Sequence, residues 1–327
     1  MIREVCKMKY RIGIDLGGTN IAGGLVDENF KIVAKASVPT VVTEGPEKIV
    51  EDISSLCSKL CEDFGLKLSE VASIGIASPG IANHFTGAVE YSCNLPMRKF
   101  PISELVSEKT GVSHVFVEND ANAAAWGEAV AGAAKGSSNS VMITLGTGVG
   151  GGIIIDNKVY SGFNCAGGEL GHIVIEHNGR QCGCGRKGCW EAYSSATALI
   201  NMTKEKIEEC KANGRASVML DAPKVSGRTA FDAMRAGDEA GKEVVDMYLD
   251  YLACGLANII NIFQPEIITI GGGVSNEGDS LVEALLPRVR AEQYGGGLVD
   301  LTEVKIATLK NDAGIIGGAV LGLNLDK

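Results

Sequence analysis

The chain has 327 residues, a formal net charge of −10, 45% hydrophobic residues and 21% charged residues. Its length suits about two globular domains, and its apolar fraction can bury a sizeable core, which excludes a disordered chain. Lysine and arginine do not cluster, so the composition argues against a nucleic-acid-binding surface. The many glycines (43) beside few prolines (8) indicate tight turns that bring the backbone close to ligands.

The N-terminal segment has no apolar stretch of the kind that a signal peptide needs, because charged residues occur throughout MIREVCKMKYRIGID. The longest apolar stretch, 244–263, contains Asp246 and Asp250, so it predicts a buried helix and no membrane span. Most of the cysteines, Cys6 among them, stand apart from one another. We therefore expect reduced thiols in a cytoplasmic protein that has no membrane partner.

The first part of the chain alternates predicted strands and helices. Apolar residues at every third or fourth position indicate a helix over 46–65, and a Ser-Pro-Gly turn at 78–80 ends the strand before it. The predicted elements are strands 10–16, 21–27, 31–38, 71–77 and 115–118, and helices 46–65 and 119–134.

The pattern then starts again. IGIDLGGTNIAGGLVD at 12–27 aligns without a gap with VMITLGTGVGGGIIID at 141–156, strand on strand and Gly17 on Gly146. The spacing is too long for a solenoid repeat, so it predicts a duplicated domain whose copies each open with a strand, a Gly loop and a second strand. An irregular stretch follows over 161–189. The later predicted elements are helices 191–209, 230–261, 280–291 and 314–323, and strands 266–270 and 304–308.

A Gly-rich turn joins the first two strands at Asp15-Leu16-Gly17-Gly18-Thr19-Asn20. Its unhindered amides can cradle phosphate oxygens, Thr19 and Asn20 add polar groups, and Asp15 can bind Mg²⁺ directly or through water. A plain hairpin turn is the simpler interpretation of one such loop. Two copies, the second at Gly146-Thr147-Gly148, favour a clamp on a triphosphate.

The second loop also satisfies G-x-G-x-x-G over 146–151, the dinucleotide fingerprint. That fingerprint requires a helix directly after it, whereas 152–156 is typical of a strand, so we reject it. A third run, Gly271-Gly272-Gly273, follows a predicted strand. It either lets a flat ligand lie against the backbone or makes a simple turn between strand and helix.

Glu118-Asn119-Asp120 stands where a strand becomes a helix. Asp120 is either a helix cap or a carboxylate that accepts a hydroxyl proton, and Asn119 offers a donor and an acceptor for hydroxyl recognition. Further polar groups follow at Glu169-Leu170-Gly171-His172 and at Glu191. As single residues these would be solvated loop positions, whereas together they are typical of sugar hydroxyl ligands.

Three cysteines cluster in a Gly-rich knuckle, at Cys182, Cys184 and Cys189. With His172 they form a closed tetrahedral zinc set, which favours a structural over a catalytic metal. His177 is the competing nitrogen ligand. If one ring nitrogen of His172 binds zinc, the other remains free to hydrogen-bond a ligand.

Taken together, these residues resemble the ROK family (repressor, open reading frame, kinase), and within it the bacterial glucokinases. The resemblance covers essentially the whole chain. It rests on DLGGTN at 15–20, SPG at 78–80, END at 118–120, LGTGVGGG at 145–152, GGELGH at 167–172, CGCGRKGCWE at 182–191 and GGGV at 271–274.

The resemblance implies an α/β fold of two actin-like (ribonuclease H-like) domains with an interdomain cleft and a zinc knuckle. The expected domains are 1–120 plus 312–327, and 121–311. The implied cofactors are ATP, Mg²⁺ and a structural Zn²⁺, and the implied assembly is a homodimer or homotetramer. Because only about ten residues precede the DxGGT strand, we do not expect the DNA-binding segment of the family's repressors.

The same resemblance implies roles for individual residues. Asp120 is the implied catalytic base, and ATP-dependent phosphorylation of glucose at O6 is the implied reaction. Gly271–Gly273 matches the adenosine side, and the two earlier Gly loops match the phosphate side. The implied sugar ligands are Asn94, Asn119, Asp120, Glu169, His172 and Glu191, and the implied zinc ligands are His172, Cys182, Cys184 and Cys189.

Two rival functions remain open at this point. One is a kinase for another hexose, namely N-acetylmannosamine, N-acetylglucosamine, fructose or allose. The other is a sugar sensor of the same fold without catalysis. The phosphoryl donor, ATP or polyphosphate, is likewise open.

Overall fold

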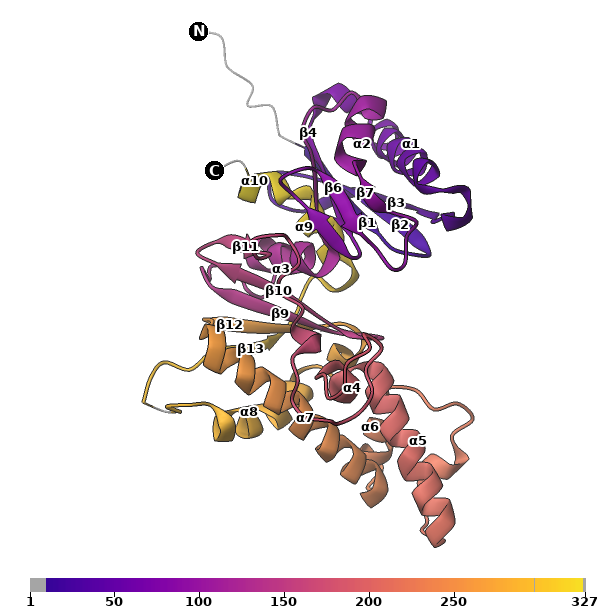
Figure 1. Cartoon of the computed structure of the whole chain (residues 1–327), viewed down its shortest axis with the longest axis vertical. Helices are drawn as coiled ribbons and strands as arrows, with labels where there is room; N and C mark the ends of the chain where they lie inside the picture. The colour runs from indigo at the N-terminus through magenta and orange to yellow at the C-terminus, as the bar shows by residue number, and fades with distance from the viewer. Residues whose placement is uncertain (1–9, 297, 326–327) are drawn as a thin grey trace. The chain divides into compact units, whose positions relative to one another are not determined.

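The computed structural model describes residues 10–296 and 298–325 (Figure 1). Residues 1–9, which include Cys6 and most of the segment without a signal-peptide pattern, lie outside the described residues. The chain divides into two compact units. The first unit contains the described residues up to Ser140 together with Gly152–Gly168 and Thr308 onward, and the second contains Val141–Gly151 and Glu169–Ala307.

The first unit is built on a five-stranded sheet whose order is β3-β2-β1-β4-β8. Strands β1 to β3 pair antiparallel, whereas β4 pairs parallel with both β1 and β8. A mostly buried pattern along β1 and β4 matches strands with helices on both faces. The strands are β1 Tyr10–Leu16, β2 Asn20–Val26, β3 Ile32–Pro39, β4 Val71–Ser78 and β8 Val115–Asn119.

Helices α1 (Pro46–Phe64) and α2 (Ile102–Thr110) lie next to each other over this sheet (Figure 1). The apolar stripe of α1, which includes Ile49, Ile53 and Leu56, is fully buried in the main core of the unit. Its spacing of three to four residues is the one predicted from the sequence. Proline at the first position and Gly65 in a left-handed conformation set the two ends of α1.

Helices α3 (Asp120–Ala131) and α9 (Ala313–Ala319) pack closely together, and α9 also contacts β1 and β4. Glycine makes this contact feasible: a Cβ atom at Gly317 would lie 1.7 Å from the carbonyl oxygen of Ala123. Such a distance excludes any larger residue. The packing fixes α3, and with it the position of Asp120 at its first turn.

A small antiparallel sheet and α2 fill the part of the chain for which the sequence predicted no element. The sheet consists of β5 (Ile81–Asn83), β6 (Ala88–Tyr91) and β7 (Arg98–Phe100). Strands of three or four residues are too short to display a period of two, which is why the sequence pattern does not reveal them.

The second sheet has the order β11-β10-β9-β12-β13. If the five strands of each sheet are numbered by their order in the chain, both sheets have the spatial order 3-2-1-4-5. The predicted duplication requires this agreement. The mixed α/β class is therefore confirmed. The strands are β9 Ser140–Leu145, β10 Val149–Ile155, β11 Lys158–Tyr160, β12 Ile267–Gly271 and β13 Glu303–Ile306. Because β10 follows the 146–148 loop directly, the rejection of a dinucleotide fingerprint is also confirmed.

Three predicted helices are each interrupted. The helix expected over 191–209 is α4 followed by α5, because Ser195 between them is extended and caps α5 through its side chain. The helix expected over 230–261 is α6 followed by α7, because Gly237 adopts φ +82° and Asp238 caps α7 through a 3.0 Å bond from the Gly241 amide to its Oδ1. The last helix is split at Val320 into α9 and α10. The remaining α-helices are α4 Glu191–Ser194, α5 Ala196–Asn213, α6 Thr229–Arg235, α7 Glu239–Phe263, α8 Asp279–Glu292 and α10 Leu321–Leu325.

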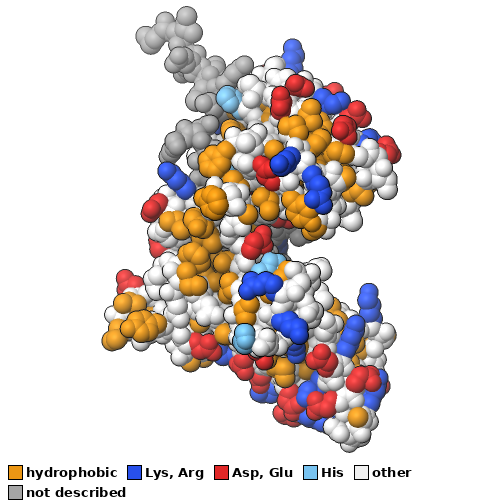
Figure 2. All heavy atoms as spheres, viewed as in Figure 1, with side chains coloured by type: hydrophobic (Ala, Val, Ile, Leu, Met, Phe, Trp, Pro, Cys, Tyr) orange, Lys and Arg blue, Asp and Glu red, His pale blue; other side chains and the backbone are white. Residues whose placement is uncertain are grey.

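Short 3₁₀ turns complete the chain at Val42–Glu44, Leu68–Glu70, Leu170–His172, Val218–Asp221, Gly273–Glu277 and Lys310–Asp312. Acidic and basic side chains are interspersed over the helical part of the second unit (Figure 2), where Glu243 pairs with both Lys206 and Arg215.

Among the described residues, none of the helices has the length and apolarity needed to cross a membrane. The domain boundaries expected at 120/121 and 311/312 stay a prediction.

Candidate active site and metal cluster

Asp120 is the first residue of α3, directly after β8. Asn119 is the helix cap: its Oδ1 accepts hydrogen bonds from the amides of Ala121 (2.9 Å) and Asn122 (3.1 Å). Asn119 also donates from Nδ2 to the carbonyl oxygen of Gly80 at 3.0 Å. Capping is thus done by Asn119, which leaves Asp120 at a helix N-terminus, where a negative charge is stabilised.

The electrostatic setting of Asp120 suits a proton acceptor. The side chain is accessible to solvent, yet the protein that surrounds it raises its pKa by desolvation, while the Ala121 amide and the Asn119 side chain lower that pKa in part. Burial raises the pKa of Asp15 to about 6, with the charge of Asp120 adding to the rise and Lys35 opposing it. A raised carboxyl pKa lies closer to neutral pH, as efficient general-base catalysis requires.

The first Gly loop is a tight turn between β1 and β2. The Gly17 amide donates to the carbonyl oxygen of Asn20 at 2.9 Å. Thr40 braces the loop, because its hydroxyl donates to the Gly17 carbonyl oxygen at 2.7 Å and its amide donates to the Thr19 carbonyl oxygen at 3.0 Å. Thr40 was not singled out from the sequence. A Cβ atom at Gly18 would lie 3.5 Å from Cβ of Asn94, so the structure brings this loop and Asn94 together.

The second Gly loop is closed by a tighter turn, since the Gly146 amide donates to the carbonyl oxygen of Gly148, two residues on, at 3.0 Å. The start of α5 supports this loop. The Ala196 amide donates to the carbonyl oxygen of Gly146 at 2.8 Å, and the Thr197 hydroxyl donates to the carbonyl oxygen of Thr147 at 2.8 Å. Both loops are therefore short turns that hydrogen bonds from neighbouring segments brace.

The third glycine run leaves the end of β12. Gly272 adopts φ +82°, and a Cβ atom there would lie 2.5 Å from the carbonyl oxygen of Leu145, at the end of β9. Gly271 ends β12, and Gly273 begins a 3₁₀ turn. Position 272 therefore needs glycine, because its backbone lies close to the end of β9 and adopts a positive φ.

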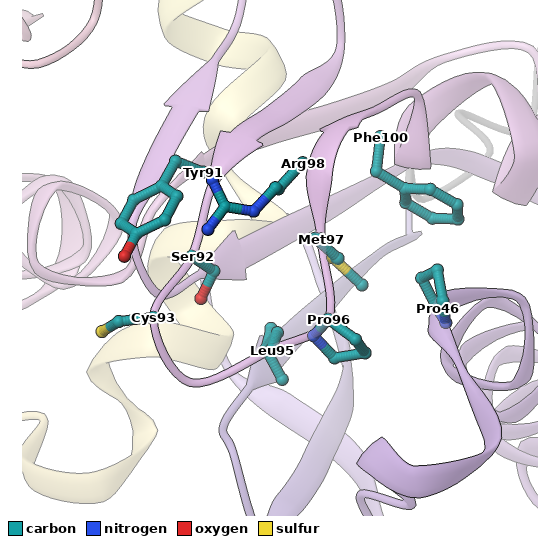
Figure 3. A pocket seen from close by; sticks show the side chains of 9 residues that line it. All are labelled: Pro46, Tyr91, Ser92, Cys93, Leu95, Pro96, Met97, Arg98 and Phe100. Carbon is teal, nitrogen blue, oxygen red and sulfur yellow. The ribbon is translucent and has the colours of Figure 1, made fainter.

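Asn94 lies in an exposed turn, where its amide donates to Ser92 Oγ at 3.4 Å. A cavity of about 520 Å³ lies beside this turn (Figure 3). The Arg98 guanidinium stands 5.0 Å from the centre of the Tyr91 ring on one of its walls. None of the predicted site residues lines the cavity. Its lining residues are Pro46, Tyr91, Ser92, Cys93, Leu95, Pro96, Met97, Arg98 and Phe100.

The Cys/His cluster comes together as the sequence predicted. One ligand atom from each of His172, Cys182, Cys184 and Cys189 lies within 4.8 Å of all the others. The sulfur atoms of Cys184 and Cys189 are 3.7 Å apart, and Cys182 Sγ is 3.7 Å from His172 Nδ1. A tetrahedral zinc with bonds of about 2.3 Å to sulfur and 2.0 Å to nitrogen requires about 3.8 Å between two sulfurs and about 3.5 Å between sulfur and nitrogen, so the donor set fits this ion.

The backbone of the knuckle explains its glycines. Gly188 adopts φ +79°, and a Cβ atom there would lie 1.7 Å from the carbonyl oxygen of Glu176. Gly185 also has a positive φ, of +90°, within the turn that returns the chain from Cys182. The four-residue group found among the described residues contains His172 and not the exposed His177.

Thiol acidity differs within the cluster. Burial raises the pKa of Cys182 to about 12 and raises that of Cys189, whereas the Arg186 backbone amide lowers the pKa of the exposed Cys184. Metal binding would have to displace protons from these thiols, so the affinity of the cluster for zinc falls as pH falls.

Glu191 connects the metal cluster to the second Gly loop. Its Oε2 accepts the Val149 amide at 3.0 Å, and its Oε1 lies 3.5 Å from Cys182 Sγ. Trp190, fully buried, anchors the preceding position by donating to the carbonyl oxygen of Tyr251 at 3.0 Å. By contrast, the side chain of Glu169 is exposed, at the start of the 3₁₀ turn that carries His172.

Sequence reasoning missed one buried pair in the first unit. His84 Nδ1 lies 3.1 Å from Glu118 Oε2, and side-chain exposures of 11% and 1% show that both groups are enclosed. Glu118 belongs to the END motif but received no role, and only the tertiary structure shows what it contacts. His84 stands in a turn that carries no pattern of its own.

Comparison with known proteins places this chain among sugar kinases. A family profile described as "ROK family" matches residues 11–324. A glucokinase of Halalkalibacterium halodurans is 37% identical over 317 residues, which cover 96% of this chain and 94% of that protein. A glucokinase of Thermotoga maritima is 37% identical over 309 residues, which cover 94% of this chain and 95% of that protein.

Solved structures agree with the sequence matches. A ROK family glucokinase from Streptomyces griseus, crystallised in complex with glucose and AMPPNP, resembles this chain with a TM-score of 0.77 at 35% identity. The match covers 95% of this chain and 98% of that one. The likeness therefore extends over both units and is not confined to a motif.

Proposed function

The chain belongs to the ROK family, and from that premise we propose that it is a hexokinase-type phosphotransferase that transfers the γ-phosphoryl group of ATP to O6 of glucose. The observation that carries the proposal is the strand-to-helix junction at Asp120, where a cap leaves a carboxylate of raised pKa accessible to solvent. The glucokinase relatives and the glucose-bound and AMPPNP-bound structure support the choice of sugar and nucleotide.

In the proposed reaction Asp120 accepts the proton of the glucose O6 hydroxyl while O6 forms a bond to the γ-phosphorus. The bond between that phosphorus and the bridging oxygen of ADP breaks, and the products are glucose 6-phosphate, ADP and a protonated Asp120. Positioning and electrostatic stabilisation supply most of the rate in phosphoryl transfer. The raised pKa of Asp120 favours proton uptake during the attack.

We propose that the sugar is held by Asn94, Asn119, Glu169, His172 and Glu191 together with Asp120. Asn119 has both lone pairs of Oδ1 committed to the cap, so toward a sugar it acts as a donor through its second Nδ2 hydrogen. This narrows the role expected from the sequence, which allowed Asn119 to donate and to accept.

For the nucleotide we propose the loops Gly17–Asn20 and Gly146–Gly148 as phosphate-binding segments and Gly271–Gly273 as the adenosine side. Asp15 would hold Mg²⁺. Burial, and after it the charge of Asp120, raises the pKa of Asp15 to about 6, so a cation beside it would offset the cost of its ionised form. Mg²⁺ bound to ATP supplies charge neutralisation on the phosphates. Zn²⁺ on the Cys/His cluster is proposed as structural, because four protein donors leave no open position.

The test of the general base is Asp120→Asn, which keeps the size of the side chain and removes its basicity. We expect kcat to fall by about 10²–10⁴-fold, with glucose affinity measured by calorimetry changed little. Asp63→Asn, an exposed acid in α1, is the matched control and should keep full turnover. Near-normal kcat in Asp120→Asn would overturn the assignment.

The test of the substrate is an ADP-release assay with glucose, N-acetylglucosamine, N-acetylmannosamine, fructose and allose, each run with ATP and with polyphosphate. Glucose should give the highest kcat/KM. A higher value for another hexose would transfer the proposal to that sugar. Sugar binding without ADP release for every hexose would favour a sensor instead of an enzyme.

A further inference from the structure

Glu118 is a buried carboxylate directly beside the proposed base, and no role in the reaction accounts for it. Its Oε1 accepts the Asn119 backbone amide at 2.8 Å and the Asn122 side-chain amide at 3.1 Å. Its Oε2 lies 3.1 Å from His84 Nδ1. Burying a carboxylate costs free energy unless both of its oxygens are well paired. The full set of partners around Glu118 therefore requires an explanation.

Helix capping does not provide that explanation, because Asn119 already satisfies the first amides of α3. Nor does the paired β8–β4 ladder need it, since that ladder is formed by backbone groups. What Glu118 adds is a fixed link to the residues on both sides of Asp120. It holds the backbone of the residue before the base and the side chain of the residue two positions after it.

The Asn122 contact shows how far this link depends on Glu118. Asn122 is 3% exposed, and among the described residues its Oδ1 has no hydrogen-bond partner. The Nδ2 bond to Glu118 is therefore what orients this amide. Since Asn122 lies in the first turn of α3, Glu118 ties the start of the helix to the end of β8 through side chains alone.

His84 is itself held in place, as a second layer of support requires. The turn that carries it is closed by Asn83, whose Oδ1 accepts the Phe85 amide at 3.1 Å. The His84 ring lies against Phe85 with centroids 4.2 Å apart, and Cys165 Sγ lies 3.8 Å from Nδ1. With the Nδ1–H tautomer, His84 donates to Glu118 and supplies the donor that completes the carboxylate.

We propose that Glu118 and His84 form a positioning pair that sets the orientation of Asp120 for proton transfer. Neither residue touches the sugar or ATP in this proposal, and both act through Asn119 and the first turn of α3. The inference rests on the proposed general-base role of Asp120. It assigns a function to the Glu of the END motif and to a histidine outside every motif recognised in the sequence.

The experiment compares His84→Ala with His84→Asn. Asparagine places an N–H donor at nearly the same distance from Cα as histidine Nδ1, so it can still donate to Glu118, whereas alanine cannot. We expect His84→Ala to lower kcat by about 10–100-fold, the loss typical of a small displacement of a catalytic group, with KM for ATP within about 2-fold of wild type. His84→Asn should recover most of the lost kcat.

All rates are expressed per glucose-binding site, counted by calorimetric titration, so that misfolded protein does not enter the comparison. His114→Ala, a change at an exposed histidine just before β8, is the matched control and should leave kcat unchanged. Should His84→Ala fail to fold, Asn122→Ala breaks the same link from the other side and should lower kcat over the same range.

A purely structural role gives a different result: the melting temperature and the number of binding sites fall, but kcat per site stays at the wild-type value. That result, or equal kcat losses in His84→Ala and His84→Asn, would overturn the positioning pair. Failure of the underlying base assignment is recognised separately, because Asp120→Asn would then retain turnover.

Discussion

Asp15 and Asp120 are both acids of the first unit, and burial raises the pKa of each. For Asp15 the charge of Asp120 adds to this rise, which brings the pKa to about 6. A folded-state pKa above the usual 3.8 means that ionising Asp15 destabilises the fold. The stabilising effect of the protonated acid is fully present below pH 3.8 and is lost as pH rises through about 6.

Asp15→Asn should therefore stabilise the protein at pH 8 and leave its stability nearly unchanged at pH 4. The shift from 3.8 to about 6 sets an upper bound of about 3 kcal/mol on the gain. Urea unfolding at the two pH values, in buffer without Mg²⁺, measures it. Asp63→Asn is the surface control. An equal effect of Asp15→Asn at both pH values would contradict the role of Asp15 ionisation, and ATP-dependent turnover should be lost in this variant.

The same residues show how far a sequence can predict a site. Asp15 lies near the end of β1 and Asp120 directly follows β8, two strands whose apolar pattern is visible. The knuckle cysteines are close together in sequence, so local order is enough to select all of these residues. His84 meets Glu118 across 34 positions, and only packing of the small β5–β7 sheet against β8 brings them together. The capping role of Asn119 could not be predicted either, because the sequence does not show which backbone amides its Oδ1 accepts.

Elements with a strong period were the ones that the sequence could predict. Strand β1 spans Tyr10–Leu16 as expected, and α1 ends one residue before the predicted limit. The interruption between α6 and α7 was missed because apolar residues continue on both sides of it, so the pattern conceals the left-handed Gly237. The spacing of apolar residues indicates which side chains are buried, whereas the end of a helix is set by the backbone conformation of a single residue.

Helix α7 offers a test of how one element positions another. Gly255 faces the buried Trp190, and a Cβ atom there would lie 1.9 Å from Cε2 of the indole. Gly255→Ala gains up to about 1 kcal/mol of helix propensity, but displacement of the indole costs about 3 kcal/mol, so a net loss of about 2 kcal/mol is expected. Because Trp190 precedes Glu191, glucose affinity should fall as well.

Urea unfolding and calorimetry measure the two effects of Gly255→Ala, and a shift in tryptophan emission reports the displaced indole. Gly227→Ala is the matched control, because a Cβ atom there meets nothing within 4 Å. Unchanged stability in Gly255→Ala would show that α7 moves away without cost, and that Trp190 does not fix Glu191.

On the scale of the whole chain, the two five-stranded sheets share one strand order, yet β11 and most of β10 of the second sheet are assigned to the first unit. The proposed base and its Glu118–His84 pair belong to the first unit, whereas the Cys/His cluster and Glu191 belong to the second. The chain enters the first unit again at Gly152–Gly168 and at Thr308. A linear division of the sequence cannot anticipate such returns, because they depend on which strands and helices pack together and not on the order of motifs.

This separation predicts that metal loss acts on one unit first. Protein purified without chelator should contain about one zinc per chain, and its removal should raise amide hydrogen exchange across 170–192 while β1 and β4 stay protected. Cys184→Ser should reproduce the change, and Cys93→Ser, at an exposed cysteine outside the cluster, should not.

Glucose titration of the zinc-free protein separates a structural ion from a catalytic one. A structural ion fixes His172 and, through Cys182, the surroundings of Glu191, so its loss should weaken glucose binding at least as much as turnover per bound glucose. A catalytic ion would leave binding intact and abolish turnover. Purified protein that contains no zinc yet binds glucose normally would contradict the four-ligand site, because three free thiols and an imidazole would then hold the knuckle unaided.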